Sequence, residues 1–298
     1  MAERLKPARV AFQGEPGAFS EAAAVQLLGE QINTVPRPTF EATFRAIPEN
    51  AADALLVPVE NSLAGSVVRV YDLLLESRLT IVAETILPIE LNLIGCPGAS
   101  LSQIRSVSSH PMALAQCERF FAAQPQLKRI PAEDTAGSVR EVLAMGDKTR
   151  AAIAGQRAAV HYGAVILQQR IQDNPENFTR FVLLVPKKAV QDYPFPSASA
   201  GDASPVMKMS IAMRLAHRPG SLLSSLEPFA RHGVNLLKIE SRPIHGHPWE
   251  YQFFVDLEAS ELSRLQQALR DLHGAAHEVR ELGVYQPARV SAASSAKK

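Results

Sequence analysis

The sequence has very little cysteine and no uninterrupted apolar run long enough to cross a membrane. Only two of its 298 residues are cysteines, Cys96 and Cys117. Two cysteines cannot form a disulfide framework and their spacing fits no zinc-binding pattern, so both are expected to be reduced, buried thiols in a cytoplasmic protein. The most hydrophobic run begins at Leu79 and contains two glutamates and a proline. It is too interrupted to cross a bilayer.

An excess of charge of either sign is also missing. The chain has 31 basic and 30 acidic residues, a formal net charge of +1. This balance gives no electrostatic reason to expect nucleic acid or an anionic membrane as a partner. The first ten residues carry charges but no apolar segment of the kind found in a secretory signal. We therefore expect a soluble cytoplasmic protein, with no nucleic acid and no membrane as partners.

The length and one biased segment indicate two domains. At roughly 150 residues per domain, a chain of this size suggests two. Residues 187–206 are rich in Pro, Ser, Ala and Gly, which predicts a linker between a domain of residues 1–186 and one of residues 207–286. Residues 287–298 are expected to form a disordered tail.

The region before the linker alternates between strand and helix patterns. Strand patterns cover 8–14, 53–61, 79–85 and 104–110, and helix patterns cover 19–29, 66–76, 112–122 and 134–146. Asp134 is the expected N-cap of the last helix, and Gly146 its C-terminal glycine. Such alternation predicts an α/β domain with mostly parallel sheets, in which ligands bind at the carboxyl ends of strands.

The region after the linker has a different order. Strands are expected over 207–215, 235–243, 249–258 and 277–285, and helices over 219–233 and 261–274. This βαββαβ order is the ferredoxin-like arrangement. Pro228 should bend the first of these helices. The residues expected to alternate onto one face of the third strand are Trp249, Tyr251, Phe253, Val255 and Leu257.

Two polar loops follow strands of the first domain. In QGEPGAFSE, Gly14 and Gly17 permit a tight turn before a helix whose free N–H groups favour an anion, although a plain strand–helix turn is the favoured interpretation of the loop taken alone. In VPVENSLAGSV, Glu60, Asn61 and Ser62 follow a strand and suit a polar ligand. The alternative for this loop is an Asx turn with Ser66 as a helix N-cap.

Two further segments place polar side chains beside apolar strands. In SSHPMALAQC, Ser109 is either a site residue or an N-cap before Pro111, and Gln116 lies about two turns along the helix. His110 has no companion at metal-ligand spacing, and no G-x-S-x-G elbow supports a Ser-His-Asp triad. In NFTRFVLLVP, Thr179 and Arg180 precede an apolar run, as polar residues at a strand edge or as part of a site.

Together these motifs resemble a known family. AFQGEPGAFSEAA, VPVENSLAGSV, SSHPMALAQC, AEDTAG, AAIAG and NFTRFVLL are similar, in order and spacing, to segments of the prephenate dehydratases. PGSLLSSLEPFARHGVNLLKIESRP looks like the C-terminal ACT regulatory domain of that family. The resemblance runs from Val10 to Tyr285. It implies an α/β catalytic domain of two lobes, like type II periplasmic binding proteins, with a cleft between them and the TRF segment where the chain crosses back, followed by a ferredoxin-like ACT domain.

The resemblance also implies roles for individual residues, and no metal or other cofactor. Thr179 would be the catalytic hydroxyl donor, and Arg180 a substrate-carboxylate partner or a salt bridge between lobes. The catalytic set it implies is Thr179, Asn61, Ser109, Gln116 and Glu133, and the substrate-binding set is Arg180, Phe181, Ser62, Ser20 and Glu60. The phenylalanine-binding set is Gly220, Ser221, Leu222, Leu223, Asn235, Glu240, Ser241, Arg242 and Pro243, where Glu240 and Arg242 could instead be a surface ion pair.

The implied function is the decarboxylating dehydration of prephenate to phenylpyruvate, with feedback by L-phenylalanine and homo-oligomers (dimers or tetramers) formed through ACT domains. Ala18 stands where many members of the family have threonine, and two motifs look like the plant-type branch. Arogenate is therefore the alternative substrate. A non-catalytic amino-acid sensor of the same architecture is the alternative outside enzymes.

Overall fold

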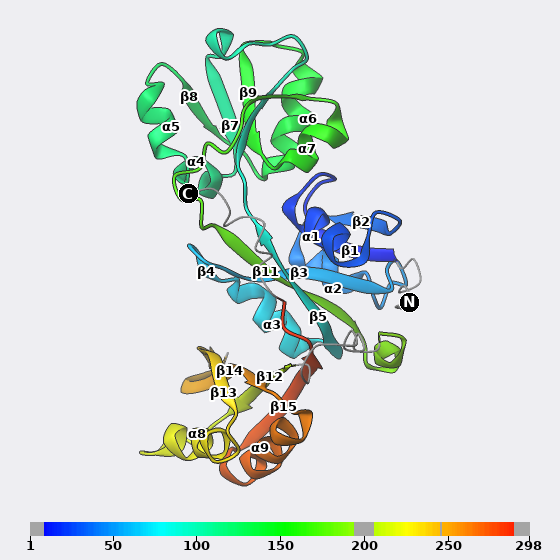
Figure 1. Ribbon diagram of the computed structural model, residues 1–298, viewed down its shortest axis with the longest axis vertical. Coiled ribbons are helices and arrows are strands. Elements are labelled where there is room, and N and C mark those ends of the chain that lie inside the picture. Colours follow the sequence, from blue (N-terminus) through cyan, green and yellow to red (C-terminus); the bar gives the residue numbers. More distant parts are fainter. Residues whose placement is uncertain (1–8, 194–205, 245, 289–298) are drawn as a thin grey trace. The chain divides into compact units, whose positions relative to one another are not determined.

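The computed structural model describes residues 9–193, 206–244 and 246–288 (Figure 1). Residues 194–205 of the expected linker and the expected tail from residue 289 lie outside these ranges. The described start of the linker forms a short 3₁₀ helix, Lys187–Asp192. Within the described ranges no helix is long and apolar enough to span a membrane. One compact unit contains residues 9–70 and 85–181, and the other contains residues 71–84 and 182–288.

The first sheet has the strand order β2-β1-β3-β11-β5, with the short β4 paired to β3. Its centre is built from the continuous apolar runs that the sequence indicates. Val10, Phe12, Leu55 and Leu56 are fully buried, and β1 runs parallel to both β2 and β3. The strands are β1 (Arg9–Gln13), β2 (Asn33–Arg37), β3 (Ala54–Asn61), β4 (Gly65–Ser66), β5 (Leu79–Pro88) and β11 (Phe178–Pro186), and the intervening helices are α1 (Phe19–Leu28), α2 (Phe40–Arg45) and α3 (Val68–Glu76).

The second sheet has the order β10-β6-β9-β7-β8 and is mixed, contrary to the expectation of mostly parallel strands. β7 is parallel to β8 and β9, but β6 is antiparallel to β9 and β10. β6 and β10 are the strands by which the chain enters and leaves this sheet. The elements are β6 (Asn92–Gly95), β7 (Ser106–Ser109), β8 (Lys128–Pro131), β9 (Arg150–Ala154), β10 (Val165–Gln168), a 3₁₀ turn (Leu101–Gln103), α4 (Pro111–Ala115), α5 (Glu118–Ala123), α6 (Thr135–Met145) and α7 (Gln156–Tyr162).

The helix expected over 112–122 is broken into α4 and α5, which corrects the sequence-based prediction. The cause is the carboxylate of Asp173, which accepts from the backbone N–H groups of Glu118 (2.8 Å) and Arg119 (2.9 Å) and so caps a second helix. The N–H of Asp173 in turn donates to the carbonyl of Gln116 (2.7 Å). Gln116 therefore lies at a helix end, next to the 169–177 segment.

Two segments, 89–91 and 169–177, carry the chain between the two sheets, and they run side by side. The N–H of Ile89 donates to the carbonyl of Asn177, and the N–H of Ile171 donates to that of Leu91, both at 2.8 Å. β11 begins at Phe178, directly after the second segment. Thr179 thus lies where the chain returns to the first sheet, as predicted.

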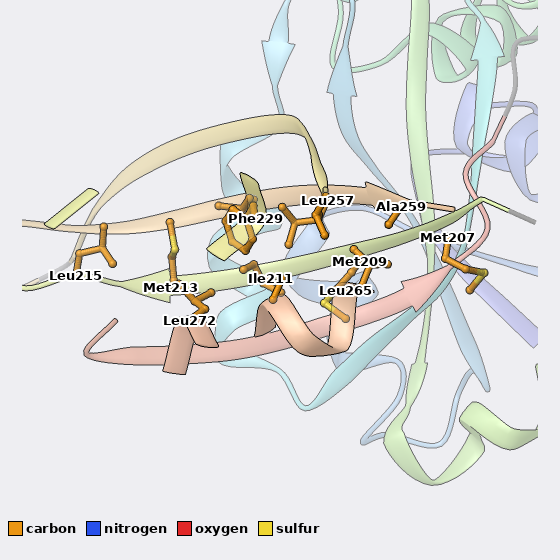
Figure 2. Packing of buried hydrophobic residues seen from close by; sticks show 13 residues of the cluster. Met207, Met209, Ile211, Met213, Leu215, Phe229, Leu257, Ala259, Leu265 and Leu272 are labelled. Atoms are coloured by element: carbon orange, nitrogen blue, oxygen red, sulfur yellow. The ribbon is translucent and has the colours of Figure 1, made fainter. Parts of the chain in front are cut away.

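The second compact unit contains an antiparallel sheet of order β13-β14-β12-β15 and two helices, which confirms the ferredoxin-like expectation. Figure 2 shows its core, where Met209, Ile211 and Met213 of β12 pack with Leu265 and Leu272 of α9. Phe253, Val255 and Leu257 follow the expected alternation, but Trp249 is 76% exposed. The elements are β12 (Met207–Arg214), α8 (Ser221–Arg231, containing Pro228), β13 (Asn235–Ile244), β14 (His247–Ala259), α9 (Leu262–Ala275) and β15 (Glu278–Tyr285).

Candidate active site

The side-chain amide of Asn61, at the end of β3, has a fixed orientation. Its Oδ1 accepts from the backbone N–H groups of Leu63 (3.0 Å) and Ala64 (2.9 Å), which is the expected Asx turn. Its Nδ2 faces Asn177 Oδ1 (2.8 Å), Thr179 Oγ1 (2.9 Å) and a backbone carbonyl (3.1 Å). The oxygen and nitrogen of an amide are told apart by their partners, and here both ends agree. Asn61 therefore donates to Thr179.

Thr179 lies on β11 and is 8% exposed. Because its oxygen accepts from Asn61, its own hydroxyl hydrogen remains available to donate to a ligand. The arrangement makes Thr179 a neutral donor held by a second donor. The Asx turn and the site role that the sequence left as alternatives for Asn61 thus occur together. Ser66 is not an N-cap, since it pairs with Glu60 in β4 and α3 begins only at Val68.

Ser109 ends β7 and is fully buried. Its hydroxyl donates to the carbonyl of Ile153 on β9 at 2.6 Å. The N-cap of α4 is His110, whose Nδ1 accepts from the N–H of Met112, so the N-cap interpretation of Ser109 is wrong. Pro111 occupies the first turn of α4, as expected.

Gln116 and Glu133 follow the neighbouring strands β7 and β8. Gln116 is partly buried, and its Oε1 accepts from Asn177 Nδ2 at 3.0 Å. Glu133 is exposed in the loop between β8 and α6. The residue before it, Ala132, donates its N–H to the carbonyl of Ser109 (2.9 Å), so Glu133 lies at the same sheet edge as Ser109.

The five residues expected to bind substrate differ in their surroundings. Ser62 Oγ donates to the carbonyl of Glu176 and accepts from the N–H of Phe178. These bonds connect its loop to the end of the 169–177 segment and to the start of β11. Arg180 lies 3.3 Å from Glu60 on neighbouring strands of the first sheet, and its side chain is 11% exposed. Phe181 (2% exposed) is a core residue, and Ser20 (7% exposed) is buried in the first turn of α1.

The first polar loop connects the two lobes. The carboxylate of Glu21, buried on α1, accepts from the N–H of Gly17 (2.7 Å), from the hydroxyl of Thr34 (2.9 Å) and from Arg157 of α7 (3.2 Å). Gly17 has a φ of 87°, and a Cβ there would lie 2.6 Å from the Cα of Ala158. The loop therefore holds a carboxylate of its own chain and packs closely against α7.

The pKa of Glu21 reflects opposing causes. Burial raises it, but the hydrogen bonds from Gly17, Thr34 and Arg157 and the charge of Arg157 lower it more, so the pKa lies below its ordinary value.

The pKa of Cys117, next to Gln116, is shifted in the opposite direction. Burial, and then the charges of Asp173 and Glu118, raise the pKa of its thiol to about 12. A thiol that stays protonated is a poor nucleophile. Among the described residues no group of three His, Cys, Asp or Glu could hold a metal ion.

The ACT unit contains a cavity of about 150 Å³. Of the expected effector residues, Ser221 and Leu222 line it, and Ser221 Oγ is buried without a hydrogen-bond partner. Gly220 precedes them as the N-cap of α8 with a φ of 82°. Leu223 is 67% exposed and does not line the cavity. The other lining residues are Leu215, Ala216, His217, Arg218, Trp249, Glu250, Tyr251 and Phe253.

The other expected effector residues are on β13 and do not line this cavity. They are Asn235, Glu240, Ser241, Arg242 and Pro243. Arg242 pairs with Asp72 at 3.5 Å.

Sequence reasoning missed Asn177 in the catalytic unit and Trp249 at the cavity. Asn177 stands two residues before Thr179 in the same quoted stretch, which was an available signal. Trp249 is the only tryptophan of the chain.

The chain has two α/β lobes, and a cluster of hydroxyl and amide side chains lies where it crosses between them. It also carries a ferredoxin-like domain. These features define a two-lobed enzyme with a regulatory domain. The family model "Prephenate dehydratase" matches residues 10–189, and the model "ACT domain" matches residues 209–274. The chain belongs to the prephenate dehydratase family, whose members are hydro-lyases.

Individual relatives agree with this assignment. The chain is 39% identical over 294 residues to the arogenate dehydratase/prephenate dehydratase 1 of Arabidopsis thaliana chloroplasts, covering 93% of this chain and 71% of the relative. It is similar to the structure of prephenate dehydratase from Arthrobacter aurescens in complex with L-Phe (TM-score 0.81, 31% identity, 94% and 90% coverage). A protein described as a novel type of quorum quenching acylase is equally similar (TM-score 0.81, 33% identity, 93% and 97% coverage).

Proposed function

We propose that Thr179 donates a hydrogen bond to the departing hydroxyl of prephenate, and that Asn61 holds Thr179 for this task. The observation that carries the proposal is the fixed amide of Asn61. Its nitrogen, 2.9 Å from Thr179 Oγ1, occupies the threonine oxygen as an acceptor and leaves the hydroxyl hydrogen for a ligand.

This geometry suits the chemistry of prephenate. Prephenate is a cyclohexadienol with a carboxylate and a hydroxyl on opposite ring carbons. Breaking the bond to the carboxylate releases CO₂, and its electron pair moves through the ring and expels the hydroxyl, which takes up one proton and leaves as water. The ring becomes aromatic, so no electron-sink cofactor is required. Charge develops on the departing oxygen, and a pre-positioned neutral donor stabilises it.

The other expected residues take supporting roles in this proposal. Ser109, Gln116 and Glu133 orient the substrate and the path of the proton. Arg180, already beside Glu60, is the cation available for a substrate carboxylate. Threonine is a very weak acid, so Thr179 acts as a hydrogen-bond donor or relay and not as the source of the proton.

An acylase activity with Thr179 as the nucleophile is less well supported. A threonine nucleophile needs an adjacent base that accepts its proton. The neighbour of Thr179 Oγ1 is the NH₂ group of Asn61, which is a donor. The arrangement therefore favours hydrogen-bond donation.

The substrate is tested by assaying prephenate and arogenate side by side. Phenylpyruvate absorbs in the ultraviolet in alkali, and L-phenylalanine from arogenate can be measured separately. We expect turnover of prephenate. Turnover of arogenate alone would show that arogenate and not prephenate is the substrate, with the same type of reaction. No product from either would leave the amino-acid sensor as the better account.

We further propose that L-phenylalanine binds in the ACT cavity and inhibits the enzyme. Leu222, Tyr251 and Phe253 offer apolar surface for an aromatic side chain, and the unpartnered hydroxyl of Ser221 offers a hydrogen-bonding group to its charged end. Trp249 lines the cavity and is the only tryptophan, so binding is measurable by its fluorescence. An unchanged emission at saturating L-phenylalanine, together with uninhibited activity, would count against this site.

We infer that the protein forms homo-oligomers through β13. This strand is an edge of the ACT sheet, and Leu236, Leu237 and Ile239 on it are 36–44% exposed. Pairing with β13 of a second copy would bury them and would bring Glu240 to Pro243 to an interface. Light scattering tests this inference, and Leu237→Glu should shift the mass toward the monomer. A monomeric wild-type protein would contradict it.

We also propose that the catalytic domain comprises residues 1–186, that the ACT domain comprises residues 207–286, and that the protein is cytoplasmic. A fragment of residues 1–186 should retain dehydratase activity without inhibition by L-phenylalanine. Cell fractionation tests the location, and recovery of the protein with membranes would contradict it.

A further inference from the structure

Asn177 lies between the residues that come from the two lobes. It is the last residue of the 169–177 segment, which carries the chain back to the first sheet, and it is 1% exposed. Its Oδ1 is 2.8 Å from Asn61 Nδ2, and its Nδ2 is 3.0 Å from Gln116 Oε1. Asn61 belongs to β3 of the first sheet, and Gln116 follows α4 beside the second sheet. One buried amide thus connects the polar groups of both lobes.

The direction of every hydrogen bond in this chain of amides follows from its first member. The oxygen of Asn61 is held by two backbone N–H groups, so its nitrogen must face Asn177. Asn177 can accept only with its oxygen, which turns its nitrogen toward Gln116. Gln116 must accept with its own oxygen, and both hydrogens of its NH₂ group stay available for other acceptors.

We propose that Asn177 is a positioning residue that keeps the NH₂ group of Gln116 as a donor of the site, beside the hydroxyl of Thr179 that Asn61 holds. This inference rests on the proposed function, in which donors face a substrate rich in oxygen acceptors. A Gln116 amide turned by 180° would present its carbonyl to those oxygens. The turn is prevented because it would place the nitrogen of Gln116 against the nitrogen of Asn177.

The variant Asn177→Asp tests the direction of the chain, because its side chain has almost the same shape. An ionised Asp at this position still accepts from Asn61 but has no hydrogen for Gln116. Gln116 must then turn its nitrogen inward, and the site loses a donor. A protonated Asp can donate to Gln116 again. Burial raises the pKa of such a carboxyl toward the pH range in which activity can be measured.

The measurement is kcat/KM for prephenate between about pH 5 and about pH 9, relative to the wild type at each pH. We expect Asn177→Asp to lose on the order of 10-fold or more near pH 8, since removing one positioned donor has at least this effect. The loss should shrink as the pH falls. Asn177→Ala, the matched control, should show the same loss at every pH. A loss in Asn177→Asp that does not change with pH, or no loss, would overturn the inference.

A second measurement tests the proposal if the Asn177→Asp variant does not fold. If Asn177 acts through Gln116, then Asn177→Ala should have almost no further effect in a Gln116→Ala background, because interacting residues are not additive. If the fold-losses of kcat/KM in the two single variants multiply in the double variant, the proposal is overturned.

A wild type inactive on both prephenate and arogenate would contradict the proposed function and not the amide direction. Hydrogen exchange of the Gln116 side-chain amide, in protein labelled with ¹⁵N-glutamine, then decides. It should be fast in the wild type and slowed in Asn177→Asp near pH 8. Equal rates would overturn the inference.

Discussion

Asn61 donates from its side-chain nitrogen to the hydroxyl oxygen of Thr179, 2.9 Å away. The direction of this bond decides what the threonine can do. Because two backbone N–H groups hold the oxygen of Asn61, the amide cannot turn round and accept the threonine hydrogen. Thr179 is therefore presented to a ligand as a donor.

Asn61→Asp should reverse this bond while the loop stays intact. The new carboxylate still accepts from the N–H groups of Leu63 and Ala64, so the Asx turn is kept. It cannot donate to Thr179, and it will accept the hydroxyl hydrogen instead. We expect kcat for prephenate to fall on the order of 10²-fold, the effect of removing one transition-state donor. Unfolding curves provide the control, and a well-folded variant with wild-type kcat would rule out this role for Asn61.

Gly220→Val should abolish inhibition by L-phenylalanine and leave kcat near normal. A φ of 82° is strained for any β-branched residue, so the start of α8, which carries Ser221, must move. The matched control is Gly233→Val in the same domain. Gly233 also has a positive φ (63°) but follows the C-terminal end of α8, away from Ser221, so inhibition should persist there. Dose–response curves with L-phenylalanine measure both. Unchanged inhibition in Gly220→Val would count against the site.

Glu21→Gln should destabilise the protein at neutral pH, and the effect should vanish in acid. The folded-state pKa of Glu21 lies below its ordinary value of 4.5. Its ionised form therefore contributes stability above pH 4.5, and this contribution is lost as the pH falls through the folded-state pKa. Hydrogen bonds to a charged group suggest a difference of about 1–3 kcal/mol at pH 7.

Denaturant unfolding from neutral to acid pH measures this difference. The control is Glu30→Gln, since Glu30 contacts the same Arg157 but is 76% exposed and should matter little. A difference in the free energy of unfolding between wild type and Glu21→Gln that stays constant or widens in acid would contradict the stabilising role of the ionised Glu21.

Features that depend on neighbouring residues could be predicted from the sequence. Asp134 accepts from the N–H of Gly137, and Gly146 ends the same helix in a left-handed conformation, both as expected. The βαββαβ order also follows from patterns along the chain, and the position of Thr179 at the crossover is what the family resemblance implies.

Features that depend on residues far apart in the sequence could not. The helix break beside Gln116 exists because Asp173, from another segment, caps α5. The role of Asn177 arises only when residues 61, 116 and 177 meet. Helical spacing alone therefore predicted one helix where there are two. The exposure of Trp249 is a local matter, since its backbone leaves the strand alternation with a φ of 68°.

The kinetics of Thr179 variants test the central claim most directly. We predict that Thr179→Ala and the nearly isosteric Thr179→Val lower kcat for prephenate on the order of 10²-fold or more with little change in KM, since the hydroxyl contributes mainly in the transition state. Thr179→Ser, which keeps the donor, should retain appreciable activity. A Thr179→Val enzyme with near wild-type kcat would contradict the claim.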